Sequence, residues 1–423
     1  MRSYLSATFE SLRYRNYRRY IVGQGVSVIG TWMQKVAQAW LVLELTDSGT
    51  LLGVTAALQQ LPTLVLTPWG GLLADRVDKR KILLCTQTAA AVPALILGIL
   101  TLSGHVTIWI VFILAVVLGI IEAIDKPARM TFVSDIVDPK HITNAVTLNN
   151  IVQNMGKVVG PALAGIMIAT VGLGYSFLAN SASFIAVLSG LWLIRPEFQQ
   201  KSTRAERSKG QLIEGVRYVR HRRDLFGPLI LMTITGMLAY NWQVVLPLLA
   251  RDTFDGDAQV AGLMFTAMGI GAVVGGLAVA GSLKATSGRL VATGLIFALI
   301  MIGAALAPTL IFALIMLSAL GAASVSFRAL ATSLMQLRAA PAMRGRVVSL
   351  LIIATNGTTP IGGPLIGWIS QEYGARSALI LGGVTTALAA GATFTYMTRK
   401  DPGTDEKVKE LAVPTFLPGE LSS

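Results

Sequence analysis

The sequence is poor in charge. Only 13% of its 423 residues are charged, against about 25% in an ordinary soluble domain. Hydrophobic residues make up 53% of the chain, and the mean hydropathy is +0.63. A soluble protein of this length would need far more polar surface to cover its core. The scarcity of charge therefore excludes a soluble globular protein and indicates lipid as the solvent.

Cysteine and histidine are scarce as well. The single cysteine, Cys85, excludes an intrachain disulfide framework and a cysteine-rich metal site. The three histidines lie singly near the ends of expected helices, where loop or interface roles are favoured over metal ligation. The sequence also lacks a G-x-x-x-x-G-K-[ST] nucleotide loop, an H-E-x-x-H zinc motif and a convincing nucleophile–base pair. We therefore expect no metal, no cofactor and no enzymatic activity.

Long apolar segments, in contrast, are abundant. A helix needs roughly 20 apolar residues to cross about 30 Å of hydrocarbon, and twelve such windows follow one another. The polar N-terminal segment has no cleavage-like end, so we expect the first span to be retained as an anchor. The predicted spans are 18–42, 50–74, 81–103, 106–128, 144–171, 174–194, 226–249, 259–283, 289–306, 309–334, 346–370 and 376–397.

The basic residues gather on one side of these spans. With the N-terminus inside, 28 of the 35 Lys and Arg residues fall on the cytoplasmic side, two on the opposite side and five within spans. This bias predicts a multi-pass membrane protein with both termini in the cytoplasm. Topology and anionic lipid then account for the net charge of +13, so we expect membrane lipid and no nucleic acid as a partner.

One long polar break divides the spans into two sets of six. The predicted fold class is an all-α integral membrane protein with twelve transmembrane helices in two six-helix bundles. We expect these bundles at 1–194 and 225–399, a cytoplasmic linker at 195–224 and a cytoplasmic tail at 400–423. The linker segment QLIEGVRYVRHRR is periodic enough for a short basic amphipathic helix on the inner membrane surface, with a solvated linker as the alternative.

Gly-Pro motifs recur at matched places in the two halves. The fifth span carries GKVVGPALAG and the eleventh carries GTTPIGGPLIG. Such correspondence is typical of a transporter built from two repeated halves. Gly-Pro within a span bends the helix, and close helix packing through small residues is the alternative. The predicted helix-bend residues are Gly156, Gly160, Pro161, Gly165, Gly363 and Pro364.

Polar side chains inside the spans predict a substrate and coupling cavity. A charge at mid-bilayer costs at least about 2.5–3.5 kcal/mol, so a retained charge is a functional candidate. Polar stripes on three spans of the first half favour a common water-filled cavity, with interhelical hydrogen bonding as the alternative. The predicted cavity residues are Lys35, Gln38, Glu122, Asp125, Asn150, Gln153, Asn154, Lys157, Asn241, Trp242, Arg328 and Asn356.

Two acids, Glu122 and Asp125, lie well inside the spans and are the candidates for carrying a proton. On one helical face, Lys126 can pair with Glu122 at the i,i+4 spacing. We favour Glu122 as the proton carrier because Lys126 and Arg129 would hold Asp125 ionised, although either acid remains a candidate. A proton gradient is the expected energy source. The excess of basic residues within spans favours an anionic or mixed-charge cargo.

The segment GGLLADRVDKRK resembles the signature loop G-x-L-A-D-R-x-G-R-K of the major facilitator superfamily, and the likeness covers essentially the whole chain. Asp78 replaces the second glycine of the motif, which should stiffen the loop or add an ion pair. GKVVGPALAG resembles the span-five motif of drug exporters. NYRRYIVGQGVSVIGTWMQKVAQAWLVLELT and DKPARMTFVSDIV resemble a bacterial branch that includes enterobactin-type siderophore exporters and macrolide-efflux permeases. The signature positions are filled by Gly71, Leu73, Ala74, Asp75, Arg76, Lys79 and Arg80.

This resemblance implies a secondary exporter of small amphipathic compounds, siderophore or macrolide-like, that works by alternating access; lipid or lysolipid transport is the alternative. We expect a monomer acting on a small-molecule substrate. The resemblance also implies that Asp75 pairs with Arg129 and approaches residues 344–347 when the inner side closes. The arginine that proton-coupled drug antiporters carry before a span-four glycine is missing before Gly119, so its role is not transferred. The implied cytoplasmic gate motif is Gly71, Asp75, Arg76, Lys79, Arg80 and Arg129.

Overall fold

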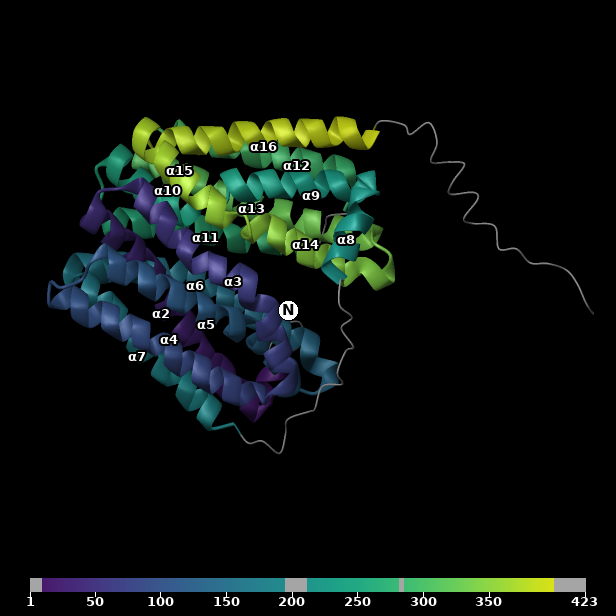
Figure 1. The fold of residues 1–423 in the computed structure, drawn as a ribbon. Coiled ribbons are helices and arrows are strands. Elements are labelled where there is room, and N and C mark those ends of the chain that lie inside the picture. Colours follow the sequence, from purple (N-terminus) through teal and green to yellow (C-terminus); the bar gives the residue numbers. More distant parts are fainter. Residues whose placement is uncertain (1–9, 195–210, 281–284, 399–423) are drawn as a thin grey trace, which may run out of the picture.

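The computed structural model describes residues 10–194, 211–280 and 285–398. Within these ranges the chain consists of helices joined by short loops, without any strand (Figure 1). Most of the predicted linker and the whole predicted tail lie outside the described residues. Ten helical segments in the described part are long and apolar enough to cross a membrane. The polar first span and the interrupted eleventh span bring the number of spans to the predicted twelve.

The first bundle contains six long helices, one for each predicted span. Ser48 starts the second of them by accepting a hydrogen bond from the backbone N–H of Leu51, as a helix cap does. Short loops join the helices, so neighbours in sequence run antiparallel. The six helices are α2 (Arg15–Thr46), α3 (Gly49–Arg76), α4 (Lys79–Leu102), α5 (Ile108–Asp135), α6 (Ile142–Thr170) and α7 (Leu173–Trp192).

The second bundle contains the remaining six spans, and two of these are interrupted. Span seven is divided into α9, α10 and a π-helical turn, whereas span eleven is divided into α14 and α15. Four uninterrupted helices form the other spans of this bundle, and the short α8 precedes it. The elements are α8 (Gln211–Arg220), α9 (Arg223–Leu238), α10 (Trp242–Leu248), η4 (Leu249–Thr253), α11 (Ala258–Ala280), α12 (Ser287–Ala305), α13 (Leu310–Arg338), α14 (Arg344–Asn356), α15 (Thr359–Tyr373) and α16 (Ala375–Thr398).

The interruptions correct the prediction of two continuous spans. Between α9 and α10, the Asn241 amide donates to the backbone oxygen of Met237 at 2.7 Å. Side-chain bonds of this kind compete with the helical ladder. Between α14 and α15 the break falls at residues 357–358, just before Pro360, which lacks a backbone N–H. The predicted bend residues Gly363 and Pro364 instead lie inside α15, and α6 runs unbroken through its own Gly-Pro motif.

Glycines let the two bundles touch backbone to backbone at one end. A Cβ atom on Gly53 of α3 would lie 2.2 Å from the carbonyl oxygen of Gly363 on α15, and one on Gly367 would lie 2.1 Å from the oxygen of Gly49. The two bundles also approach each other between α6 and α11, where a Cβ on Gly262 would lie 2.5 Å from the carbonyl oxygen of Pro161. We call the end where α3 and α15 touch the sealed end. The small residues of the Gly-Pro motifs therefore serve close packing between helices.

At the opposite end the bundles diverge. Figure 1 shows them approaching one another at the left and spreading apart toward the right. Here α3 ends at Arg76 and α14 begins at Arg344. We call this the basic end, because the arginines and lysines of the signature loop and of the α13–α14 connection lie on it. The interface between the bundles is thus sealed at one end and open at the other.

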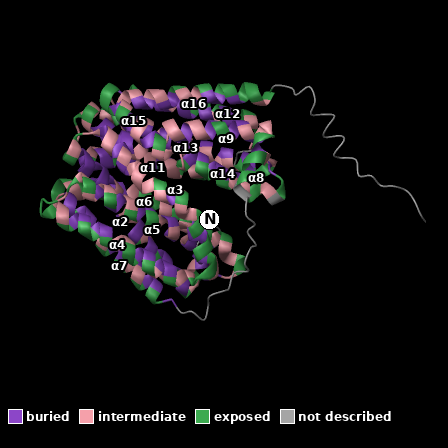
Figure 2. Ribbon diagram, in the orientation of Figure 1, coloured by how far each residue is buried: buried purple, intermediate pink, exposed green. Residues whose placement is uncertain are grey.

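The outer surfaces of both bundles carry large apolar side chains. Figure 2 shows exposed residues along the outward faces of the helices. They include Trp109 and Trp192, which are 71% and 75% exposed, and Leu388, which is 69% exposed. Contiguous apolar surface on this scale is unsuited to water and fits contact with lipid tails. The protein is therefore a multi-pass membrane protein.

The helix predicted in the linker forms as α8 and docks on the second bundle. Glu214 of α8 pairs with Arg346 of α14 at 2.7 Å. The Tyr218 hydroxyl accepts a hydrogen bond from the backbone N–H of Ala340 at 3.1 Å. These contacts attach α8 to the start of span eleven at the basic end. Its position on a membrane surface stays a prediction.

Close packing inside the second bundle leads to a first testable prediction. A Cβ atom on Gly271 of α11 would lie 1.7 Å from the carbonyl oxygen of Ser318 on α13. Gly271→Ala should therefore force two helices of one bundle apart and lower the stability by about 1–3 kcal/mol. The midpoint of thermal unfolding in detergent measures this loss. Gly276→Ala on the same helix is the control, because its nearest neighbour lies at 3.7 Å; an equal loss there would contradict the packing argument.

Candidate transport site

A polar cavity lies between the bundles and consists of two adjoining chambers. The first chamber, of about 270 Å³, is lined only by residues of the first bundle. The interface chamber, of about 340 Å³, is lined by residues of both bundles. Together they have the size of a small-molecule site. The two chambers share Trp32, Lys35, Gln59, Glu122, Lys126 and Lys157.

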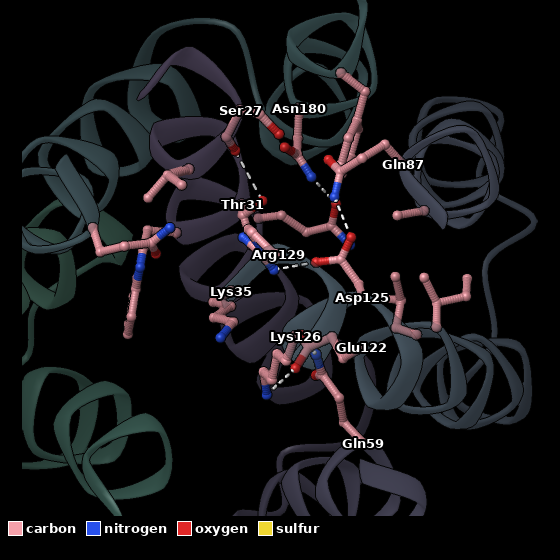
Figure 3. A pocket seen from close by; sticks show the side chains of 18 of the residues that line it. Ser27, Thr31, Lys35, Gln59, Gln87, Glu122, Asp125, Lys126, Arg129 and Asn180 are labelled. Carbon is pink, nitrogen blue, oxygen red and sulfur yellow. Dashed lines mark hydrogen bonds and ion pairs between the residues drawn. The ribbon is translucent and has the colours of Figure 1, made fainter. Parts of the chain in front are cut away.

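Glu122 of α5 stands where the chambers meet. Its carboxylate pairs with the ammonium group of Lys126 at 2.6 Å, as their spacing predicts. The amide of Gln59 on α3 donates to the same carboxylate at 3.3 Å. Glu122 therefore connects α5 to α3, the helix that makes the glycine contact with α15 at the sealed end. Figure 3 shows Glu122 and Lys126 beside Gln59 on one side of the first chamber.

Asp125, one turn further along α5, is held much more firmly. Its side chain is 4% exposed and pairs with Arg129. The hydroxyl of Thr86 on α4 donates to one carboxylate oxygen at 2.8 Å. The amide of Gln87, on the same helix, donates to the same oxygen at 2.7 Å (Figure 3). With both oxygens engaged, Asp125 and Arg129 join α4 to α5 as a buried network. This arrangement fits a structural role better than a changing protonation state.

This difference between the acids can be tested by stability. Asp125→Asn leaves the Arg129 guanidinium, which is 21% exposed, without its carboxylate, so the free energy of unfolding should fall by about 3 kcal/mol. Glu122→Gln is the matched control, because its partner Lys126 has a side chain that is 44% exposed. Loss of this ion pair should lower the free energy of unfolding by about 1 kcal/mol or less. Thermal unfolding of both variants in detergent compares them. Similar losses would contradict the distinction drawn between the two acids.

Three cations reach the chambers without an acidic partner. The ammonium groups of Lys35 and Lys157 lie 4.7 and 5.9 Å from the ring centre of Trp32, within the range of cation–π attraction. The guanidinium of Arg328 lies 4.8 Å from the ring centre of Tyr240. In the part of the chain that the structure describes, none of these cations forms an ion pair. Aromatic faces hold them in place instead.

Most of the other predicted cavity residues also line the chambers. Gln38 and Gln153 line the first chamber, and Asn241, Trp242 and Asn356 line the interface chamber. Asn150 and Asn154 are not among the residues that line the two chambers. Asn154 accepts a hydrogen bond from Lys157 at 3.1 Å. Asn150 lies one turn closer to the basic end of α6 and is exposed there.

Several lining residues were missed by the sequence analysis. Adjacent amides, Gln59 and Gln60, project from the middle of α3 into the interface chamber. Their position in an otherwise apolar span was a usable signal. Trp32 was missed because a single mid-span aromatic is as common in packing as in binding. Its role as the platform for two lysines depends on the neighbouring α6.

The signature loop does not form the implied contact between Asp75 and Arg129 in this structure. Asp75 is exposed and forms no ion pair with any described residue, so the implied Asp75–Arg129 pair is absent from this structure. Arg129 faces Asp125 on its own helix, and the bundles are apart at this end. The predicted pair between Asp75 and Arg129 belongs to the state in which the basic end is closed, and it stays a prediction.

The remaining loop residues fix the loop to its own bundle. Lys79 pairs with Asp135 at the end of α5 at 2.6 Å. Arg80 donates to the backbone oxygens of Leu191 and Trp192 at 2.8 and 2.7 Å. Asp78, which replaces the motif glycine, accepts from the backbone N–H of Arg80 at 2.8 Å and so caps α4. Asp78 therefore acts as a helix cap, and its expected stiffening of the loop stays a prediction.

Two helical bundles around a central polar cavity, with one end of their interface sealed, define a membrane transporter of the two-bundle class. Residues 6–415 match the model of the family described as transmembrane secretion effector. The chain therefore belongs to this family of the major facilitator superfamily, which confirms the resemblance found in the sequence. The fold class is confirmed as well, since solved structures of transporters share this fold.

Curated relatives include exporters of different compounds. The chain is 28% identical over 262 residues to the staphyloferrin A transporter of Staphylococcus aureus, a match that spans 60% of this chain and 64% of that protein. It thus matches less than two thirds of that transporter's length. It is 24% identical over 369 residues to macrolide efflux protein A of Streptococcus pyogenes, covering 85% of this chain and 91% of the relative. It is also 24% identical over 362 residues to the enterobactin exporter EntS of Shigella flexneri, covering 83% and 84%.

Solved structures share the fold across the whole chain. A bacterial homologue of the lysosomal transporter Spinster superposes with a TM-score of 0.72 at 16% identity, covering 92% of this chain and 99% of the other. The nucleoside transporter NupG superposes with a TM-score of 0.74 at 13% identity, covering 91% and 100%. A D-xylose–proton symporter gives 0.66 at 15% identity, covering 90% and 98%. At this identity the likeness concerns the fold alone.

Proposed function

We propose that the protein is a secondary exporter that moves small amphipathic compounds, siderophore-like or macrolide-like, out of the bacterial cytoplasm by alternating access. The observation that carries the proposal is the interface chamber, which both bundles line with polar and charged groups. A chamber built in this way can pass from one side to the other when the bundles rock about it. The relatives named for siderophore and macrolide export support the cargo class.

In this proposal the basic end faces the cytoplasm and the sealed end faces the outside. The excess of Lys and Arg at one end of a membrane protein is typical of its cytoplasmic side. Both termini and α8 then lie in the cytoplasm of a bacterium, and the protein lies in its inner membrane. With this orientation the open end of the interface faces the cytoplasm, so that a substrate can enter the chambers from inside the cell.

A proton gradient drives the exchange in this proposal, and Glu122 carries the proton. A proton arriving at the Glu122 carboxylate from outside neutralises it and breaks its ion pair with Lys126, which is 2.6 Å long in this structure. The hydrogen bond from Gln59 connects this event to α3. Since α3 forms the contact with α15, a change at Glu122 is linked to the sealed end of the interface. Release of the proton to the cytoplasm restores the ion pair.

The experiment is accumulation in an efflux-deficient bacterial host that expresses the chain. A macrolide, a carboxylate siderophore, an anionic dye and an anionic lysolipid are compared with an empty vector, with and without an uncoupler. The proposal predicts several-fold lower accumulation of at least one soluble compound, with the difference abolished by the uncoupler. Unchanged accumulation of every soluble compound would contradict it. Movement of the lysolipid alone would indicate lipid transport instead.

A further inference from the structure

We infer that the interface chamber binds a polyanion, a soluble compound that carries two or more carboxylate-like groups beside a planar or apolar part. This inference rests on the proposed function, since it names the substrate class of the same chamber. Four cationic side chains and one carboxylate line the chamber, which leaves a surplus of three positive charges. The cationic side chains are Lys35, Lys126, Lys157 and Arg328, and the carboxylate is Glu122.

The single carboxylate does not offset this surplus. Glu122 is engaged by Lys126, its neighbour one turn along α5, and by the amide of Gln59. Lys35, Lys157 and Arg328 remain without an acid among the described residues of either bundle. Charge inside a membrane protein is costly when it is not balanced. A ligand with negative groups would supply the balance that the chain itself does not.

The three cations come from both bundles, so a bound anion with several negative groups can contact both bundles at once. Lys35 projects from α2 and Lys157 from α6, and both ammonium groups lie over Trp32. Arg328 projects from α13 on the other side of the interface, over Tyr240. Arginine favours the planar, two-pronged geometry of a carboxylate, whereas each lysine acts as a point charge. A compound with two or more anionic groups bridges the bundles.

The rest of the chamber wall suits the uncharged part of such a compound. Trp32 and Tyr240 present flat aromatic surfaces, and Phe265 and Met268 add apolar wall. Amide side chains of both bundles, including Gln60 and Asn356, can donate to and accept from hydroxyl or amide groups. A chamber of about 340 Å³ has the size of a small-molecule site and can hold a compound of this kind.

The test is binding of a charge-graded series to the full chain in neutral detergent. The ligands are benzene-1,3,5-tricarboxylate, benzene-1,3-dicarboxylate, benzoate and benzyltrimethylammonium, measured by titration calorimetry at constant ionic strength. The affinity should rise by about tenfold from benzoate to the dicarboxylate, because a second charged contact forms. Benzyltrimethylammonium should bind more weakly than any carboxylate. Equal affinities across the series, or tighter binding of the cation, would overturn the inference.

Variants locate the binding in the chamber. Lys35→Gln, Lys157→Gln and Arg328→Gln should each weaken binding of the tricarboxylate by about tenfold. Lys140→Gln is the matched control, since it removes the same charge at an exposed position outside the chambers. Thermal unfolding verifies that each variant is folded, and the three separate positions keep the test valid if one variant fails. Equal weakening by Lys140→Gln would overturn the site.

Failure of this inference is distinguishable from failure of the proposed function. If the chain exports a cationic or neutral drug and does not bind the tricarboxylate, the polyanion site is wrong and the export function stands. If the tricarboxylate binds through the three cations and the host exports none of the tested compounds, the site stands and the export function is wrong. An anionic lysolipid that binds in place of the carboxylates would contradict a soluble polyanion.

Discussion

Glu122→Gln is expected to abolish transport driven by a pH gradient and to preserve exchange of substrate at equilibrium. The variant has no carboxylate to protonate, so the ion pair with Lys126 no longer opens and closes with the proton. Exchange of labelled for unlabelled substrate across the membrane needs no net proton movement and should continue. In inside-out vesicles acidified by respiration, uptake of an exported compound should fall by about tenfold or more.

The matched control for this experiment is Glu372→Gln, which removes an exposed acid at the end of α15 outside both chambers. It should transport as the unchanged chain does. Gradient-driven uptake by Glu122→Gln at the rate of this control would remove Glu122 from the coupling mechanism. Loss of the equilibrium exchange as well would assign Glu122 to substrate binding and contradict a role confined to the proton.

Gly53→Ala is expected to open the sealed end. The added Cβ would lie 2.2 Å from the carbonyl oxygen of Gly363 in the other bundle. This clash exists only while the bundles touch, so separation of the bundles relieves it without unfolding either one. The clash expected for Gly271→Ala lies between two helices of one bundle, so separation of the bundles does not relieve it. Gly53→Ala should therefore shift the population toward the outward-open state, keep its thermal stability and lose about tenfold or more of its transport rate.

Gly25→Ala serves as the control for this substitution. It lies on α2, where the nearest neighbour of an added Cβ is a side-chain atom of Val152 at 3.5 Å, an ordinary contact. Transport and stability should match those of the unchanged chain. A transport rate in Gly53→Ala equal to that of Gly25→Ala would show that the glycine contact is not needed to seal the interface.

The sequence predicted the number of spans because lipid imposes a simple rule on apolar length. It could not predict the interruptions at Asn241 and at Gly357, since both lie within windows that remain apolar overall. Their causes are local, an amide that bonds to its own helix and a proline that cannot donate. The Gly-Pro motifs were recognised, but their use in packing between bundles depends on helices far apart in sequence.

The candidate site was predicted only in part, because helical periodicity gives the face of a helix on which a residue lies but not its contacts with other helices. Periodicity placed Glu122 and Lys126 on one face of α5, and their ion pair confirms it. Periodicity also placed Asn150 on the same stripe as Gln153, but it carries no information on how far along α6 the chamber extends. The resemblance implied a contact between Asp75 and Arg129 when the basic end is closed, whereas the bundles lie apart at that end in this structure.

The most direct test of alternating access is to label the interface chamber from each side of the membrane. The native Cys85, which is exposed, is replaced by serine, and Asn356→Cys places a single thiol in the chamber wall. A membrane-impermeant maleimide is then applied to inside-out and to right-side-out vesicles. Alternating access about the glycine contact predicts fast labelling from the cytoplasmic side, slow labelling from outside, and a reversal of this preference by about tenfold or more in Gly53→Ala. Equal labelling from both sides, or a preference that Gly53→Ala leaves unchanged, would contradict it.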